Sequence, residues 1–414
     1  MHNEEPNRMG AADTVIRGLQ AHLQQPIAAE RAWAEHFSII VHCHLRWDFV
    51  WQRPQQIFSR LARMHRVLFI EDAILGDGEA SLGITEPHPN VVRVVPSLPH
   101  GMGIDAQCRA TLQLLRRAMD SHPLLSGRFE QAVQWFYSPM TSPVFLGQFG
   151  ARGIVYDCMD ELANFRFAPP ELREREAFLM AKADVVFTGG RQLYDSKSRH
   201  HGNVHFYGCG VDAVHFGQAR LASTKVPQSI AALTRPVFGY FGVIDERLDY
   251  ALIEALADRF PEASVAMVGP LAKVERAQLP SRPNIFWLGQ QSYEALPSIV
   301  KGFDVCLMPF AMNEATQFIN PTKTLEYMAA GKPIVSTPVP DVVRNFAPVV
   351  DIAATEEAFC DAVERAWRAP SQDHIGEGIA RANAATWDAT VASMAQDIRN
   401  AVSDYASATA QASA

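Results

Sequence analysis

The sequence predicts an α/β fold with two domains, each built on a parallel sheet that helices cover on both faces. Short apolar runs alternate with helical stretches from residue 37 onward, a pattern typical of parallel sheets. A small, polar segment at 218–236, which contains two prolines, interrupts this alternation, and the pattern then restarts. The 414 residues are enough for two separate hydrophobic cores.

Each apolar run defines an expected strand, and each amphipathic stretch an expected helix. In the first domain (37–217) strands are expected at 37–41, 67–70, 91–95, 133–137, 154–156, 185–188 and 204–206, with helices at 52–64, 105–121, 171–181 and 191–200. In the second (237–373) strands are expected at 237–241, 264–268, 285–288, 305–308, 334–336 and 349–352, with helices at 249–259, 292–302, 321–330 and 355–369.

Three further segments complete the predicted organisation. Residues 1–36 form a polar extension with a helix at about 13–36. Residues 374–404 form one long terminal helix, and residues 405–414, rich in alanine and serine, form a loose tail.

Composition excludes several classes of protein. A net charge of −8 and a pI of about 6 argue against a nucleic-acid partner, while contact of a local basic patch with anionic lipid stays open. The six cysteines include no C-x-x-C pair, so we expect buried free thiols in a reducing compartment. No apolar stretch approaches a membrane span, and the first ten residues do not form a secretory signal. We therefore expect a cytoplasmic protein.

The stretch 320–337 is predicted to be a loop, a short helix and a buried strand. Asn320 is a suitable N-cap and Pro321 suits the first helical position. Thr322 and Lys323 offer a hydroxyl and a cation for phosphate, and Glu326 follows one turn later. The alternative interpretation is that Lys323 and Glu326 form an ordinary solvated ion pair.

The letters PTKTLEYMAAGKPIVST at 321–337 resemble the nucleotide-sugar signature of GT-B glycosyltransferases of the family 4 type. This resemblance implies two Rossmann-like domains that face a cleft, with the acceptor on the first domain and the donor on the second. It also implies that 374–404 crosses back to the first domain. Thr322 and Lys323 would face the donor pyrophosphate, and Glu326 would bind its ribose.

Other donor positions are carried over from the same family. Gly242 matches the turn that approaches the donor phosphates, but Val243 stands where the family has a basic residue, so Arg247 is the expected substitute. Gly269 and Gly289 end the next two strands and would flank the nucleotide base. Ordinary tight turns are the alternative at both glycines.

The loop at 311–319 departs from the family. Phe318 stands eight positions before Glu326, where the family often has a second glutamate. Asn313, Glu314 or Gln317 is left to contact the donor sugar.

The segment after the first strand resembles the W-D-x-x-x-Q-R-P-Q entry of teichuronic-acid-type and related polysaccharide glycosyltransferases. Trp47 and Trp51 offer flat faces for sugar rings, and Arg53 is expected to contact an anionic acceptor or the leaving phosphate. Packing of both tryptophans in the core is the alternative.

Three acids, namely Asp157, Asp160 and Glu161, follow the strand expected at 154–156, and one of them would serve catalysis at the carboxyl end of that strand. Asp160 is the first choice and Asp157 the second, as a proton acceptor or as support for an oxocarbenium-like transition state. Capping of a helix N-terminus by Asp160 and Glu161 is the alternative. His42 and His44 lack further ligands at suitable spacing, so no metal site is expected.

Together these features predict a glycosyltransferase that moves a sugar from a UDP or GDP type donor to a saccharide or lipid-linked acceptor in surface polysaccharide biosynthesis. The resemblance implies a metal-independent, retaining hexosyltransferase without a bound cofactor. Two alternatives stay open. One is a nucleotide-sugar epimerase or hydrolase on the same fold, and the other is a catalytically degenerate binding or scaffold subunit.

Overall fold

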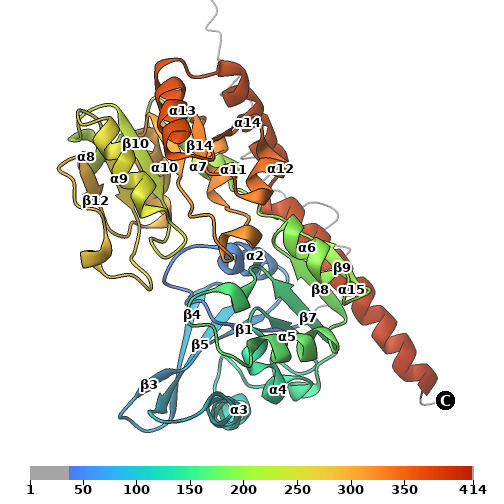
Figure 1. Cartoon of the computed structure of the whole chain (residues 1–414). Coiled ribbons are helices and arrows are strands. Elements are labelled where there is room, and N and C mark those ends of the chain that lie inside the picture. Colours follow the sequence, from blue (N-terminus) through green and yellow to red (C-terminus); the bar gives the residue numbers. More distant parts are fainter. Residues whose placement is uncertain (1–36, 413–414) are drawn as a thin grey trace, which may run out of the picture. The chain divides into compact units, whose positions relative to one another are not determined.

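Two sheets carry the fold, and the strands of each run mainly parallel (Figure 1). The computed structural model describes residues 37–412. The predicted extension at 1–36, with its helix, lies outside the described residues. From Phe37 onward the chain forms one compact unit.

The first sheet has nine strands in the order β3-β5-β2-β1-β6-β7-β8-β9, with β4 antiparallel to β5. Their bounds are β1 Ile39–Cys43, β2 Val67–Glu71, β3 Ile74–Gly76, β4 Ser81–His88, β5 Val91–Pro99, β6 Val133–Phe136, β7 Gly153–Cys158, β8 Val185–Thr188 and β9 Val204–Phe206. Strands β3 and β4 were not predicted. Gly83 and Pro87 interrupt the apolar alternation of β4, which is typical of strands at a sheet edge.

Helices connect these strands at the positions the sequence predicts, with ends that differ by a few residues. They are α2 Arg53–Leu61, α3 Ile104–Ser121, α5 Leu172–Met180 and α6 Arg191–Lys197, together with the single turn α4 Ser142–Phe145. A buried cluster from β1, β2, β5, β6 and β7 packs with residues of α3, α4 and α5 on one face of the sheet.

The second sheet has six strands, all parallel, in the order β12-β11-β10-β13-β14-β15. Its strands are β10 Val237–Phe241, β11 Ser264–Val268, β12 Ile285–Trp287, β13 Val305–Met308, β14 Ile334–Ser336 and β15 Asp351–Ile352. Its helices are α9 Tyr250–Arg259, α10 Leu296–Lys301, α11 Lys323–Ala329, α12 Pro340–Phe346 and α13 Glu356–Arg368. All six strands were predicted, whereas α12 was not.

Both sheets share one topological feature that decides where ligands bind. In the first sheet β1 lies between β2 and β6, and in the second β10 lies between β11 and β13. The chain therefore adds strands first on one side of β1 or β10 and then on the other side. The six-stranded order is the classic doubly wound order, in which ligands bind at the carboxyl ends of the strands at this switch point. The switch points here lie between β1 and β6 and between β10 and β13.

The C-terminal region corrects the prediction of one long helix at 374–404. It forms two helices, α14 Gln372–Ala384 and α15 Trp387–Ala412. The break is held by Val211, whose N–H donates to the carbonyl oxygen of Ala385 at 2.8 Å, and by a bridge between Val211 and Thr386. The predicted loose tail is also corrected, because α15 continues to Ala412.

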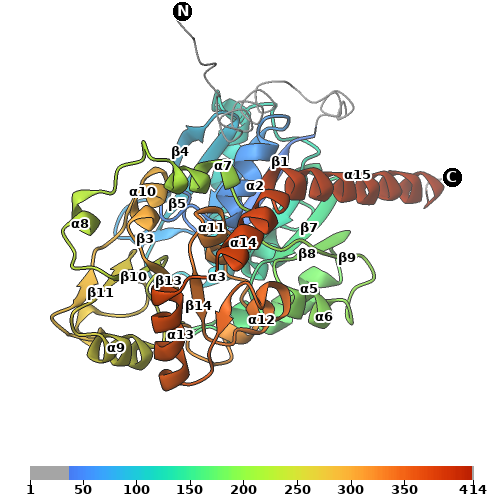
Figure 2. The ribbon, with the colours of Figure 1, turned by 90° about the horizontal axis from the view of Figure 1, so that it is seen from above.

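Helix α15 contacts α2, β7 and β8 of the first half, and it lies beside β7 and β8 in Figures 1 and 2. The segment that connects the two sheets, predicted as a linker at 218–236, includes the short helix α8 Gln228–Ala231 and follows α7 Ala213–Gly217.

A buried ion pair joins three elements of the first half at the carboxyl edge of its sheet. Arg53, at the start of α2, donates from Nε to both carboxylate oxygens of Asp157, at 3.1 and 3.2 Å, and its Nη2 lies 3.0 Å from Oδ1. Its Nη1 donates to the carbonyl oxygen of Tyr207 at 2.7 Å. The two side chains are 3% and 0% exposed, so neither charge has water as an alternative partner.

We expect Asp157→Ala to lower the free energy of unfolding by about 3–5 kcal/mol, because it leaves the Arg53 guanidinium buried without its counter-charge. Urea unfolding followed by circular dichroism measures the change.

The matched control is the double variant Arg53→Met with Asp157→Leu, which removes both charges and keeps side-chain volume. It should be much less destabilised than Asp157→Ala. Equal losses in the two variants would show that the pair contributes through packing and not through charge.

Candidate functional site

A cleft of about 160 Å³ lies between the carboxyl ends of the two sheets. It is lined by residues that follow β1, β7, β8 and β9 in the first half and by residues that follow β10 to β13 in the second. The cleft therefore includes the switch point between β10 and β13, where this topology binds ligands. Eight predicted site residues line it, namely Arg53, Asp160, Gly242, Arg247, Gly269, Thr322, Lys323 and Glu326.

Three predicted site residues do not line the cleft. Trp47 is buried and packs edge-to-face against Trp51 and Phe69, with ring centroids at 5.9 and 5.2 Å. Trp47 therefore has the core position of the alternative interpretation, and Trp51 is the tryptophan that lines the cleft. Asp157 is held by Arg53, as described above. Gly289 acts through its backbone only, since its carbonyl oxygen accepts from the Gly269 N–H at 2.9 Å.

The turns after β10 and β11 approach each other so closely that Gly269 cannot carry a side chain. Gly242 has a φ of +142° and Gly269 a φ of +151°, values that glycine adopts readily and other residues rarely. A Cβ on Gly269 would lie 1.8 Å from the carbonyl oxygen of Gly242. The two glycines thus form a wall of bare backbone. Lys323 lies next to this wall, since a Cβ on Gly242 would be 3.0 Å from Lys323 Cε.

Lys323 and Arg247 bring two cations to this wall. The Lys323 ammonium lies 5.2 Å from the ring centroids of both Tyr240 and Phe310, where the ring faces attract a cation. Burial and the neighbouring Arg247 lower the pKa of Lys323. An anion bound between the two cations would reverse this effect by favouring the protonated amine.

Arg247 is not free in this structure. Its Nε and Nη2 donate to the carboxylate of Asp245 at 3.0 and 2.7 Å. Asp245 was not singled out from the sequence, because an acid two residues before a cation is an unremarkable pattern on a loop. The Asp245 carboxylate takes up two of the N–H groups of Arg247. The guanidinium still lies at the cleft, where it provides the positive charge that Val243 lacks.

Glu326 faces the cleft from α11, and burial raises the pKa of its carboxyl while nearby Lys323 opposes that shift. The start of α11 differs from the prediction. The N-cap position is Thr322, so Pro321 precedes the helix, and the Asn320 side chain caps nothing. Asn320 instead donates to the carbonyl oxygen of Gly189 at 3.0 Å and so connects the two sides of the cleft.

The loop at 311–319 does not present its predicted polar residues to the cleft. Asn313, Glu314 and Gln317 are absent from the lining, where Phe310 and Ile319 lie instead. The Asn313 side chain is used locally, since its Oδ1 accepts from the Thr316 N–H at 3.1 Å.

Asp160 is the predicted acid that reaches the cleft. Burial raises the pKa of its carboxyl to about 6, against the opposing effect of Arg247. The turn that carries it is held by Glu161, whose carboxylate accepts from buried Lys197 at 2.8 Å. Lys197 also pairs with Glu176 at 2.8 Å, so a buried charge cluster supports the position of Asp160.

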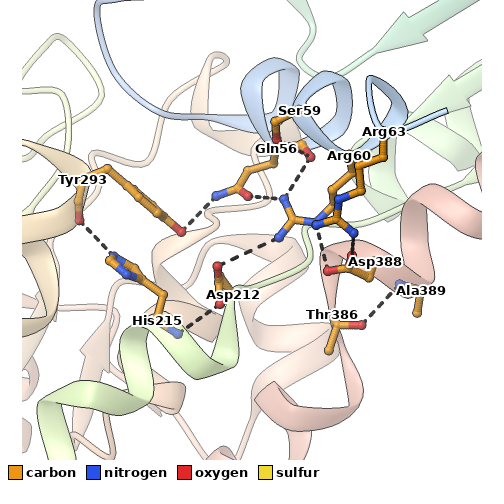
Figure 3. A network of polar contacts seen from close by, with 10 residues as sticks. All are labelled: Gln56, Ser59, Arg60, Arg63, Asp212, His215, Tyr293, Thr386, Asp388 and Ala389. Carbon is orange, nitrogen blue, oxygen red and sulfur yellow. Dashed lines mark hydrogen bonds and ion pairs between the residues drawn. The ribbon is translucent and has the colours of Figure 1, made fainter. Parts of the chain in front are cut away.

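A second polar network joins the two halves beside the cleft (Figure 3). Gln56 of α2 donates to the Tyr293 hydroxyl at 3.0 Å, and Arg60 of α2 donates to Asp388 of α15 at 3.0 Å. His215 stacks on Tyr293 with ring centroids at 4.4 Å and bonds to its carbonyl oxygen at 2.9 Å. Helix α2 therefore connects Arg53 at the cleft with residues of both the second half and α15.

Some residues that line the cleft were not predicted as site residues, because no short sequence motif assigns them a role in binding or catalysis. They are chiefly Met159, Gly189, Cys209, Asn320, Gln290 and Gln291. All except Asn320 follow the end of a predicted strand. The rule that ligands bind at such ends in parallel sheets was the signal available for them.

Residues 37–412 contain no group of three or more His, Cys, Asp or Glu side chains that could hold a metal ion. In the same range, none of the helices has both the length and the apolar character needed to cross a bilayer. All six cysteines are free. Five of them are buried, as predicted, whereas Cys209 is only partly buried.

Comparison with known proteins places this geometry in a family context. Residues 235–369, which contain β10 to β15, match the family model described as glycosyl transferases group 1. Over 243 residues the chain is 25% identical to TuaH of Bacillus subtilis (strain 168), whose description assigns it provisionally to teichuronic acid biosynthesis as a glycosyltransferase. The match covers 54% of this chain and 60% of that protein, so it spans less than two thirds of that relative.

Several solved structures share the fold. Sucrose-phosphate synthase from Thermosynechococcus elongatus matches with a TM-score of 0.65 at 14% identity, over 88% of this chain and 98% of that one. A UDP-forming α,α-trehalose-phosphate synthase from Burkholderia xenovorans, in complex with glucose-6-phosphate, matches with a TM-score of 0.63 at 13% identity, over 88% and 100%. At these identities the likeness establishes the fold alone, which is GT-B.

We expect Asp160→Asn to stabilise the protein at pH 7.5, by an amount on the order of 1 kcal/mol. The folded-state pKa of about 6 lies above the ordinary value of 3.8. Ionised Asp160 therefore disfavours the folded state fully above about pH 6 and ceases to do so below about pH 4.

Urea unfolding of the wild type and the variant between pH 7.5 and pH 5 tests this expectation, with Asp361→Asn, an exposed acid, as the control. The difference should shrink as the pH falls through 6. A loss of stability at pH 7.5 would mean that the ionised carboxylate has stabilising partners.

Proposed function

We propose that this chain, whose residues 235–369 form a group 1 glycosyl transferase domain, is a glycosyltransferase of GT-B fold. It would transfer a hexosyl unit from a nucleoside-diphosphate sugar of UDP or GDP type to a saccharide or lipid-linked acceptor. The observation that carries the proposal is the cleft at the β10 and β13 switch point, where Lys323, Arg247 and Glu326 converge on a wall of two glycine backbones.

The donor diphosphate fits the cationic part of the cleft. Gly242 and Gly269 lack side chains, so phosphate oxygens approach the backbone there without obstruction. Lys323, with Arg247 beside it, neutralises the charge that grows on the leaving diphosphate. Thr322 adds a hydroxyl at the same place.

Glu326 fits the donor ribose. Its carboxylate lies on the cleft side of α11, one turn beyond Thr322 and Lys323. Two ribose hydroxyls offer the donors that a carboxylate accepts, as in dinucleotide-binding folds. Because burial raises the pKa of Glu326, a pair of bound hydroxyls would favour the ionised form and lower that pKa again.

Asp160 faces the same cleft from the first half and is the proposed catalytic acid or base. A carboxyl with a pKa of about 6 accepts a proton from an acceptor hydroxyl more readily than an ordinary aspartate does, near neutral pH. We do not propose Asp157 as the catalytic acid or base, because its buried carboxylate is paired with Arg53. Arg53 lines the cleft as well, and contact with an anionic acceptor or the leaving phosphate stays part of the proposal.

The finer parts of the proposal rest on resemblance. Similarity to TuaH supports surface polysaccharide assembly in the cytoplasm, with peripheral membrane contact if the acceptor carries a lipid. We propose a retaining, metal-independent reaction on the basis of the family resemblance alone.

The ion pair between Arg247 and Asp245 favours a binding subunit without catalysis, as do Val243 and Phe318 at positions where the family has a basic residue and a glutamate. If Asp245 keeps the guanidinium from the donor, the cleft would hold a nucleotide without stabilising the leaving group. Retained donor binding with no turnover on any acceptor would support that function, and consumption of donor without acceptor would support an epimerase or hydrolase.

We expect calorimetry to show binding of one nucleotide among UDP, GDP, ADP and TDP. Glu326→Ala should weaken that binding about tenfold or more, since a lost hydrogen bond to a charged group costs about 1.5–3 kcal/mol.

Glu262→Ala is the control, because Glu262 is exposed in the turn before β11 and does not line the cleft. It should leave affinity unchanged. Failure of all four nucleotides to bind the wild type would overturn the assignment of the donor site.

A further inference from the structure

A second cavity, of about 200 Å³, lies in the first half and shares no lining residue with the cleft. His42 and Cys43 at the end of β1 form one side of it, Ser138 and Thr141 after β6 form another, and α3 contributes Gln107. The cavity therefore lies at the other switch point, between β1 and β6. An open sheet of this topology binds its ligand at that place.

Two polar side chains in the cavity wall have no partner within the described part of the chain. His42 is 1% exposed, and neither of its ring nitrogens has a hydrogen-bond partner. Its ring is fixed between Phe136 and Phe145, each with a centroid 4.6 Å away. The Thr141 hydroxyl is also buried without a partner. Each such group costs about 1–3 kcal/mol when unsatisfied, so both side chains call for a partner that occupies the cavity.

The charge of the wall restricts the chemistry of that partner. No lysine or arginine lines the cavity, whereas Glu71 and Asp72 do. The Glu71 carboxylate is already bound by Arg46 at 3.0 Å and by the Trp47 N–H at 2.9 Å. An anionic ligand would thus meet two carboxylates, one of which is paired with Arg46, and no lysine or arginine in the wall itself, which disfavours a phosphorylated ligand.

His42 stays neutral in this environment, because burial lowers its pKa to about 3. A neutral imidazole offers one N–H donor and one nitrogen acceptor, the complement of a hydroxyl group. Ser138 and Thr141 add hydroxyls, and Ile70, Ile104 and Phe145 add apolar surface. Such a wall matches a ring that carries hydroxyls on its edge and C–H bonds on its faces.

We propose that this cavity binds an uncharged, hydroxyl-bearing sugar ring, the monosaccharide unit of the acceptor. The proposal rests on the proposed function for its link to acceptor chemistry. The segment that starts at His42 in the cavity wall continues to Val50–Arg53 in the cleft wall. One stretch of chain, from the end of β1 to the start of α2, therefore lines both sites.

The test uses the full chain and a panel of glucose, galactose, mannose, rhamnose and N-acetylglucosamine, with glucose 6-phosphate as the anionic probe. Saturation-transfer NMR detects binding with and without UDP, and titration gives the affinity. We expect at least one neutral sugar to bind and to bind more tightly than glucose 6-phosphate.

His42→Phe keeps a flat aromatic ring, Thr141→Val keeps side-chain volume, and both remove the unpartnered polar atoms. Each should weaken sugar binding by about fivefold to tenfold, the value of one net hydrogen bond. The control is His65→Phe, a buried histidine that stacks on Phe37 just before β2 and lines no part of the cavity. It should leave sugar affinity unchanged, and thermal unfolding verifies that each variant folds.

Three results would overturn the proposal: no neutral sugar of the panel binds, glucose 6-phosphate binds more tightly than all of them, or both cavity variants bind as the wild type does. If His42→Phe fails to fold, Thr141→Val decides alone. The affinity for the nucleotide that calorimetry identifies, measured in the same samples, separates the two sites. Normal binding of that nucleotide without sugar binding rejects this cavity alone, and sugar binding that depends on His42 without binding of any of the four nucleotides rejects the donor site alone.

Discussion

The buried pair of Arg53 and Asp157 is the interaction on which the geometry of the first half depends. It ties the first residue of α2 to the end of β7, and through the Tyr207 carbonyl to the end of β9. Those ends form one side of the cleft. Further along α2, Gln56 and Arg60 contact Tyr293 and Asp388. Since buried ion pairs seldom increase stability relative to apolar packing, we attribute this pair to the placement of α2, which adjoins both halves and α15.

The two sheets use one topology for two different environments. At the β10 and β13 switch point the chain places Lys323 and Arg247 beside bare backbone, which suits a diphosphate. At the β1 and β6 switch point it places neutral His42 and two hydroxyls without any cation, which suits a sugar. This division follows from the loops and not from the sheets, because the strands of both are apolar and buried throughout their central positions.

The cleft concentrates groups that are unfavourable for stability. Asp160 and Glu326 ionise less readily than ordinary acids, and Lys323 is harder to protonate than an ordinary lysine, in each case because of burial. Partial compensation comes from Asp245 on Arg247 and from the two aromatic rings around Lys323. Groups that are costly when the cleft is empty become favourable when a ligand supplies opposite charge or hydrogen bonds.

The sequence alone determined the α/β class, both parallel sheets, nearly all strands, the placement of Gly242 and Gly269 at strand ends, and that of Lys323 and Glu326 in the first turn of a helix. These features follow from local patterns, since apolar periodicity and glycine turns act over a few residues. Only the tertiary structure decided that Trp47 is buried while Trp51 lines the cleft, that Asp157 is neutralised by Arg53, that Asn320 bonds to Gly189, and that the terminal helix breaks beside Val211. Each of these outcomes depends on a partner that lies far away along the chain, and neither composition nor spacing specifies which distant groups a side chain will meet.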